Sequence, residues 1–279
     1  MPGVFFIFAG PISEQLIEMQ TAPRIRLTVI IICTCIIAFS SAFAMTALFN
    51  SDEPKPVAIE EKMTFKKMIA LKTLEEYDRW HSNGLTIREK DTAVRSILKA
   101  YWKLGGIDVK DYQLENGSWQ YNHPWSAVFI SWVMKQAGAG DKFPYSILHS
   151  KYIVWARDNV KKEQLPLYAA YDITDSLSAW PEPGDLICMN RKRNRFNMNT
   201  IDPSCISHCD IVVEVNKEQG YIISIGGNVG QTVNKRMIWL DQSGFVDTTR
   251  NYKVLDAEEK DPEGSQKEIF GIIRVNRQY

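Results

Sequence analysis

The sequence lacks an excess of charge of either sign, because 33 lysines and arginines balance 33 aspartates and glutamates. Nucleic-acid-binding domains usually carry a basic surplus, so no nucleic-acid partner is expected. The sequence also has no phosphate-binding loop, dinucleotide fingerprint or haem motif, so no cofactor is expected. Its four histidines do not form an HExxH motif or a comparable ligand spacing, which argues against a metal site.

One long apolar run stands out near the N-terminus. Leu27–Phe49 contains no charged residue, two arginines precede it, and acidic residues follow it. One interpretation is an uncleaved membrane anchor, because the run is long enough to span a bilayer. The other is a signal peptide that ends at Ala42-Phe43-Ala44, with translation starting at Met19. Both interpretations place the rest of the chain outside the cytoplasm, either periplasmic or secreted, and the first anchors it to the inner membrane.

Cysteine is scarce beyond this run, where only Cys188, Cys205 and Cys209 remain. In an oxidising compartment an odd number of cysteines predicts one disulfide and one free thiol. We expect Cys188 to pair with Cys205 or Cys209, because either bridge would fasten the loop that leads to His208. The alternative is that all three are small buried hydrophobic side chains.

The chain divides into a targeting segment over residues 1–49, a linker over 50–61 that is charged and contains proline, and one domain over 62–279. In the domain, apolar residues at helical spacing come first and short β-branched segments between turns come second, which predicts an α+β fold. The expected helices are Lys62–Leu71, Glu75–Trp80, Glu89–Leu104, Trp125–Ala137 and Tyr145–Val160, and Asp111–His123 is expected to be a loop. The expected strands are Leu186–Met189, Ile211–Val215, Tyr221–Ile225, Val233–Leu240 and Ile269–Val275.

The most informative segment is Pro124-Trp125-Ser126-Ala127, at the start of an expected helix. It places a hydroxyl in the first helical turn, where the helix dipole and unpaired backbone N–H groups favour an anion and provide an oxyanion site. Further along, Ser207-His208 opens a strand and is expected to face this serine across the fold. The alternative interpretation is that Ser126 only caps its helix and that His208 is an ordinary surface histidine.

With Pro183-Gly184-Asp185-Leu186 and Gly226-Gly227-Asn228, these segments resemble, in order and spacing, the CHAP and NlpC-type peptidoglycan hydrolases. This superfamily of bacterial cell-wall enzymes is papain-like, so the resemblance implies N-terminal helices packed on a small antiparallel sheet. The superfamily usually has cysteine where this chain has Ser126. The chain is therefore similar to an uncharacterised bacterial family, a domain of unknown function, that carries serine at this position.

The resemblance implies a nucleophile, a base and a polar group that orients the base. The matching residues are Ser126, His208 and Asn228. Asp210 is a second candidate for the orienting role, because it is two residues from His208 and lies on the same strand face. The candidates for substrate binding near the serine are Trp125, His123, His149 and Tyr152.

The implied function is cleavage of peptide or amide bonds in peptidoglycan by an exported enzyme with a serine–histidine site. Two alternatives stay open. In the first, His208 and Asp210 act as acid and base on the glycan strand, as in a lysozyme or a lytic transglycosylase. In the second, the domain is a catalytically inactive module that binds the cell wall. The oligomeric state is left open.

Overall fold

The structure is a computed structural model that describes residues 63–276, except 83, 177, 192–194 and 257–267. The expected targeting segment and linker, including the apolar run Leu27–Phe49, lie outside the described residues. Within the described part, no helix is both long enough and apolar enough to cross a membrane.

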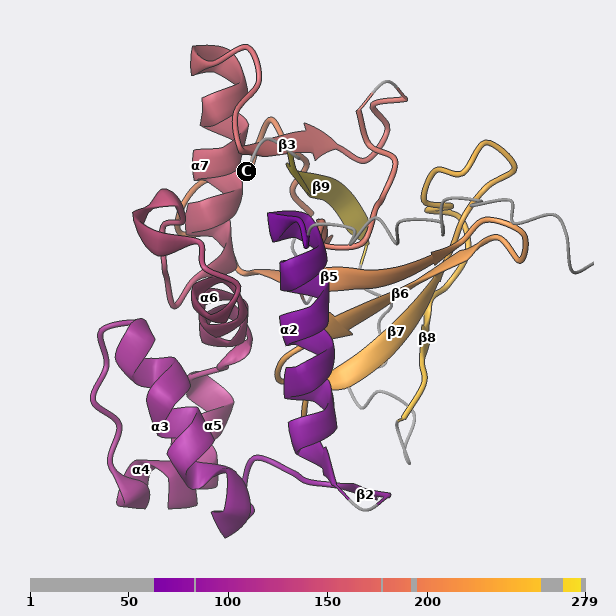
Figure 1. Ribbon diagram of the computed structural model, residues 1–279. Coiled ribbons are helices and arrows are strands. Elements are labelled where there is room, and N and C mark those ends of the chain that lie inside the picture. Colours follow the sequence, from indigo (N-terminus) through magenta and orange to yellow (C-terminus); the bar gives the residue numbers. More distant parts are fainter. Residues whose placement is uncertain (1–62, 83, 177, 192–194, 257–267, 277–279) are drawn as a thin grey trace, which may run out of the picture. The chain divides into compact units, whose positions relative to one another are not determined.

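The N-terminal half of the domain is helical (Figure 1). Helix α2, the longest among the described residues, is a single helix where two were expected, and the Thr64 hydroxyl caps its start by accepting from the Lys67 N–H at 3.2 Å. The helices are α2 (Phe65–Trp80), α3 (Arg95–Leu104), α4 (Asp111–Glu115), α5 (Gly117–Asn122), α6 (Ser126–Gln136) and α7 (His149–Lys162), with short 3-10 turns at Thr92–Val94 and Gly140–Lys142.

The second half forms a seven-stranded antiparallel sheet in the order β3-β9-β4-β5-β6-β7-β8. The α+β prediction is therefore confirmed, with a larger sheet than expected. The seven strands are β3 (Tyr168–Asp172), β4 (Leu186–Asn190), β5 (Ser207–Asn216), β6 (Tyr221–Gly226), β7 (Asn234–Trp239), β8 (Lys253–Val254) and β9 (Ile269–Val275), and a separate hairpin pairs β1 (His81–Ser82) with β2 (Leu85–Thr86).

The described residues form two hydrophobic clusters, one on each face of the sheet. The larger cluster lies between the helices and the sheet and contains Leu186 and Cys188 of β4, whereas Ile187 and Met189 belong to a second cluster. Because side chains alternate along a strand, both faces of β4 are covered, and all five of its residues are buried. Helix α6 contacts α2, α3 and strands β5 and β6, so the residue that begins α6 is held at the centre of the domain.

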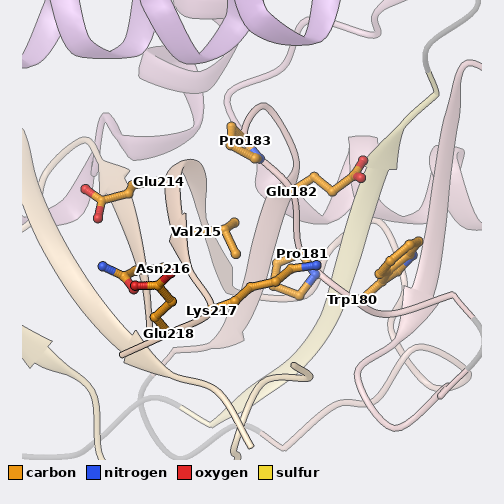
Figure 2. A pocket seen from close by; sticks show the side chains of 9 residues that line it. All are labelled: Trp180, Pro181, Glu182, Pro183, Glu214, Val215, Asn216, Lys217 and Glu218. Atoms are coloured by element: carbon orange, nitrogen blue, oxygen red, sulfur yellow. The ribbon is translucent and has the colours of Figure 1, made fainter. Parts of the chain in front are cut away.

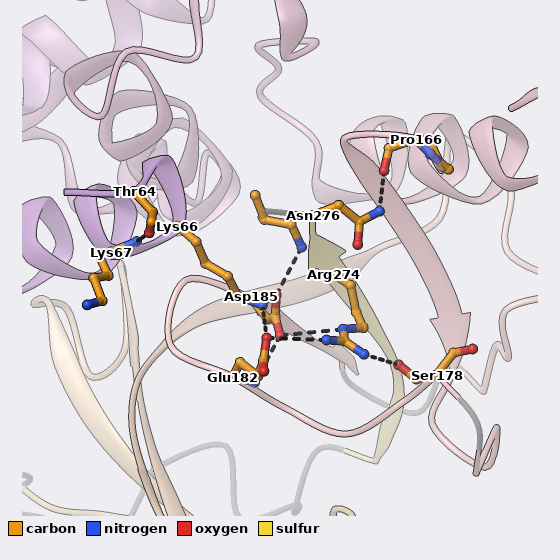
Figure 3. A network of polar contacts seen from close by, with 10 residues as sticks. Thr64, Lys66, Lys67, Pro166, Ser178, Glu182, Asp185, Arg274 and Asn276 are labelled. Atoms are coloured by element: carbon orange, nitrogen blue, oxygen red, sulfur yellow. Dashed lines mark hydrogen bonds and ion pairs between the residues drawn. The ribbon is translucent and has the colours of Figure 1, made fainter. Parts of the chain in front are cut away.

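A buried ionic network joins α2 to the turn before β4 and to β9 (Figure 3). The Lys66 ammonium lies 2.8 Å from the Glu182 carboxylate and 2.7 Å from that of Asp185, and Arg274 lies 3.3 Å from Glu182. Gly184 fits beside this network because a Cβ there would lie 2.4 Å from the Lys66 carbonyl oxygen. The Pro-Gly-Asp segment therefore links α2 to strands β4 and β9 of the sheet.

Three sequence predictions of local structure were wrong. The segment Asp111–His123 contains α4 and α5 instead of a loop, because Asn116 caps α5 through bonds from the Ser118 and Trp119 N–H groups. Strand β3 was not predicted, although it pairs with β9 along its whole length. Helix α7 begins at His149, four residues later than expected, because Leu148 has extended backbone angles.

Candidate active site

Ser126 and His149 form the centre of the candidate site. Ser126 is the first residue of α6 and His149 the first residue of α7, and Ser126 Oγ lies 2.7 Å from His149 Nε2. Both residues are buried, with exposed fractions of 2% and 4%. The N-terminus of a helix favours an anion on Ser126 and disfavours a positive charge on His149, which suits a serine nucleophile beside a neutral imidazole base.

Tyr152 contacts the other nitrogen of the His149 ring. It lies one turn further along α7, and its hydroxyl is hydrogen-bonded to His149 Nδ1. Complete burial raises the pKa of the Tyr152 phenol well above its usual value, so the phenol stays protonated at neutral pH. In the tautomer with its proton on Nδ1, the His149 ring donates to the Tyr152 oxygen through Nδ1–H. Nε2 then carries no proton and accepts the Ser126 hydroxyl proton, as a base requires.

His208 belongs to a second polar cluster, together with Asp210 and Arg236. His208 Nε2 lies 2.8 Å from Asp210 Oδ1, and the other oxygen of Asp210 binds Arg236 of β7 and accepts from Ser224 Oγ at 3.3 Å. Burial alone would raise the pKa of Asp210, but Arg236 and His208 outweigh it and hold this pKa well below its usual range. Asp210 is therefore an ionised carboxylate that accepts a hydrogen bond from the His208 ring.

The two clusters meet at their histidines. The ring centroids of His149 and His208 are 5.0 Å apart, and the rings are tilted by 52°. The hydrogen bond of the Ser126 side chain goes to His149, whereas His208 was predicted as the base. The structure thus brings Ser126, His208 and Asp210 into one region and inserts His149 as the histidine that contacts the serine.

The glycines after β6 allow this close packing. A Cβ at Gly226 would lie 1.8 Å from Asp210 Oδ1 and 3.1 Å from His208 Nε2, and one at Gly227 would lie 2.5 Å from Phe129. Asn228 follows with a left-handed backbone (φ 56°) and makes no side-chain hydrogen bond to the described residues. Of the two candidates for orienting His208, Asp210 is the one that contacts it.

The side chains of the other two predicted substrate-binding residues contact other helical residues. Trp125 is buried in the core, where its ring stacks on Trp80 with centroids 4.8 Å apart and its indole N–H donates to Glu89 at 2.6 Å. His123 is exposed, and its ring stacks on Trp119 at 4.3 Å. These contacts give Trp125 a role in packing, whereas His149 contacts Ser126 directly and Tyr152 reaches it only through the His149 ring.

The three cysteines of the domain are present as thiols, so the predicted disulfide is not formed in this structure. Cys188 and Cys209 lie directly opposite each other on β4 and β5, with their sulfurs 3.1 Å apart. Burial raises the pKa of the Cys209 thiol well above its usual value. Cys205 instead contacts Asp202 at 3.3 Å. Of the two pairings considered, only that of Cys188 with Cys209 brings the sulfurs together.

Arg236 was missed in the sequence, although a signal was present. It lies in the middle of a predicted strand, and side-chain alternation places it on the same face as Asn234 and Ile238, which are both buried. An arginine at an inward-facing strand position needs an anionic partner, so its position in the sequence predicts a buried carboxylate beside it. Among the described residues, no group of histidine, cysteine and carboxylate side chains is arranged to hold a metal ion.

The fold and the site define a class: an α+β domain with a buried serine–histidine pair between two helix N-termini and the sheet. A comparison with family profiles matches residues 100–265, and the chain belongs to the family described as an uncharacterised protein conserved in bacteria, DUF2272. No curated protein and no solved structure matches the chain significantly. The matched region contains both polar clusters, whereas α2 and β9 lie outside it.

Proposed function

We propose that this protein is an exported peptidoglycan hydrolase that cleaves a peptide or amide bond, with Ser126 as the nucleophile and His149 as its base. The observation that carries the proposal is the 2.7 Å contact between Ser126 Oγ and His149 Nε2 at two helix N-termini. The membership in a bacterial family and the resemblance to papain-like wall hydrolases support the wall as the substrate. The apolar run Leu27–Phe49 supports export.

The reaction proceeds in two steps. Ser126 Oγ attacks the carbonyl carbon while His149 Nε2 takes the hydroxyl proton, and the backbone N–H groups at the start of α6 stabilise the oxyanion. His149 then gives this proton to the departing amine, which leaves an ester on Ser126. Water deprotonated by His149 hydrolyses the ester and restores the serine. Because Ser126 is 2% exposed, a substrate reaches it only when neighbouring side chains move.

In this proposal the cluster of His208, Asp210 and Arg236 stabilises the charge that develops on His149. The carboxylate of Asp210 lies one ring away from His149, and its negative charge stabilises the positive charge that develops on the histidines during the proton transfer. The same geometry disfavours cleavage of the glycan strand by His208 and Asp210. Most glycosidases use two carboxyl groups, one of them protonated, whereas this cluster contains the single carboxylate of Asp210, which Arg236 keeps ionised.

A serine-directed fluorophosphonate probe tests the nucleophile without assuming a substrate. Mass spectrometry of the labelled protein is expected to place the adduct on Ser126, and Ser126→Ala is expected to remove it. His149→Ala is expected to slow labelling by roughly a hundred- to ten-thousand-fold, because the base is lost. His123→Ala is the matched histidine control, since His123 is exposed and stacked on Trp119. Absence of labelling in the wild type would favour the inactive wall-binding module.

A further inference from the structure

A groove with a cavity volume of about 480 Å³ lies on the sheet away from Ser126. It is lined by the segment Trp180–Pro183 and by the end of β5 with the turn that follows it, Glu214–Glu218. Asn216, which ends β5, is eight residues from His208, or about 26 Å along the strand at roughly 3.3 Å per residue. The groove is therefore a separate site from the serine–histidine centre.

The two walls of the groove differ in chemistry. Figure 2 shows Trp180 on one side, Glu214, Asn216 and Glu218 on the other, and the Lys217 side chain reaching across between them. Trp180 is 44% exposed although it is the largest apolar side chain of the lining. The Glu218 carboxylate is exposed and has no hydrogen-bonding or ionic partner among the described residues.

These walls select a neutral ligand that has both an apolar face and many hydroxyl groups. An anion would meet the carboxylates of Glu214 and Glu218. A cation would meet the positive charges already placed at the Trp180 ring, where Lys217 lies 5.7 Å and Arg274 5.2 Å from the centroid. A purely apolar ligand would desolvate the carboxylates without giving them a donor. The hydroxyl and amide N–H groups of a sugar can donate hydrogen bonds to the carboxylates, and the C–H face of its ring can pack on the indole.

We infer that this groove binds a short run of amino sugars that are neutral because they are N-acetylated. The groove would so hold the glycan strand while the peptide is cut at Ser126. The volume lies within the range of small-molecule sites, roughly 300–1,000 Å³. Lys217 is exposed, so its side chain can leave the Trp180 ring when a sugar stacks there. The inference rests on the proposed wall substrate, but it concerns residues that take no part in the serine chemistry.

The test is isothermal titration of the full-length protein with chitotetraose, the neutral tetramer of N-acetylglucosamine. The wild type is expected to bind with a Kd of about 1 mM or tighter. Trp180→Ala is expected to weaken binding at least about tenfold, as for a central aromatic anchor. Lys217→Ala, which uncovers the ring, is expected to bind equally or more tightly. Trp239→Ala on β7 is the matched tryptophan control and is expected to bind like the wild type.

Three outcomes would overturn the inference: no binding by the wild type, wild-type binding by Trp180→Ala, or a preference for cations. A preference for cations would be seen if the fully deacetylated tetramer, which is cationic, bound more tightly than chitotetraose and if Glu218→Gln abolished that gain in affinity. Failure of the proposed hydrolysis is read separately, because fluorophosphonate labelling of Ser126 does not involve the groove. Labelling without sugar binding refutes the groove alone, and sugar binding without labelling refutes the serine mechanism alone.

Discussion

Replacing Arg236 with methionine is expected to destabilise the domain strongly at neutral pH. Arg236 and Asp210 are both fully buried, and Arg236 binds one oxygen of Asp210 while His208 binds the other. Methionine keeps much of the apolar stem but removes the cation, so the Asp210 carboxylate remains buried with only the His208 ring and the Ser224 hydroxyl as hydrogen-bond partners among the described residues. Removing one partner of a buried ion pair typically costs about 3–5 kcal/mol, and we expect a loss of this size at pH 7.

The pH dependence follows from the depressed pKa of Asp210. A carboxyl group whose pKa is lower in the folded state stabilises the fold above its unfolded pKa of about 3.9, and this contribution is lost as the pH falls through the folded pKa. Arg236→Met removes the main cause of the depression, so the pKa of Asp210 rises. The mutant carboxyl then takes up a proton at a higher pH, and its deficit relative to the wild type shrinks as the solution is acidified.

Urea unfolding at pH 7 and at pH 4 measures both effects, with the double variant Asp210→Asn, Arg236→Met as the matched control. The double variant has no buried carboxylate, so it is expected to lose less stability than the sum of the two single variants. A loss below about 1 kcal/mol for Arg236→Met, the range of surface pairs, would refute the reasoning. A deficit that is the same at both pH values would also refute it.

Four further predictions concern other parts of the molecule. Asp185→Ala is expected to lower the free energy of unfolding in urea by about 3–5 kcal/mol, because it leaves the Lys66 ammonium buried with Glu182 alone. The control is Glu75→Ala, which breaks the exposed ion pair with Lys72 and should lower it by less than about 1 kcal/mol. His208→Ala is expected to lower wall-degrading activity, because it removes the ring that lies between Asp210 and His149, and Ser126→Cys is expected to preserve or raise amidase activity; wild-type turnover in His208→Ala would show that the second cluster is not needed. Non-reducing peptide mapping of exported protein is expected to find Cys188 joined to Cys209, and three thiols in that protein would exclude the bridge. A periplasmic phosphatase fused at Lys55 is expected to be active, and activity only of a reporter confined to the cytoplasm would contradict export.

The sequence predicted most of the fold because its periodic patterns are local. Strand β9 has the predicted bounds, Ile269–Val275, since β-branched and apolar residues fill a segment that is buried on both faces. Strand β5 begins at Ser207, before the apolar residues from Ile211 that marked it, because its polar start pairs with β4. Strand β3 escaped prediction because it is short and depends on pairing with β9, a partner about a hundred residues away.

The candidate site was predicted only in part, because some of its features are local in the sequence and others depend on contacts between distant residues. The motif around Ser126 and the pair of His208 and Asp210 are local signals, and each has the predicted placement at a helix start or on one strand. The partnership of Ser126 with His149 depends on how the starts of α6 and α7 pack, which no local spacing records. The role of Arg236 depends on strand register, because β7 must pair with β6 for Arg236 to reach Asp210.

The most direct test of the central claim is digestion of purified peptidoglycan sacculi, with the products analysed by mass spectrometry. The wild type, Ser126→Ala, His149→Ala and the control His123→Ala are compared under the same conditions. The account predicts new amino groups from the wild type and from His123→Ala, and none above background from the other two variants. Release of reducing or anhydro sugar ends, or equal amine release by Ser126→Ala and the wild type, would contradict it.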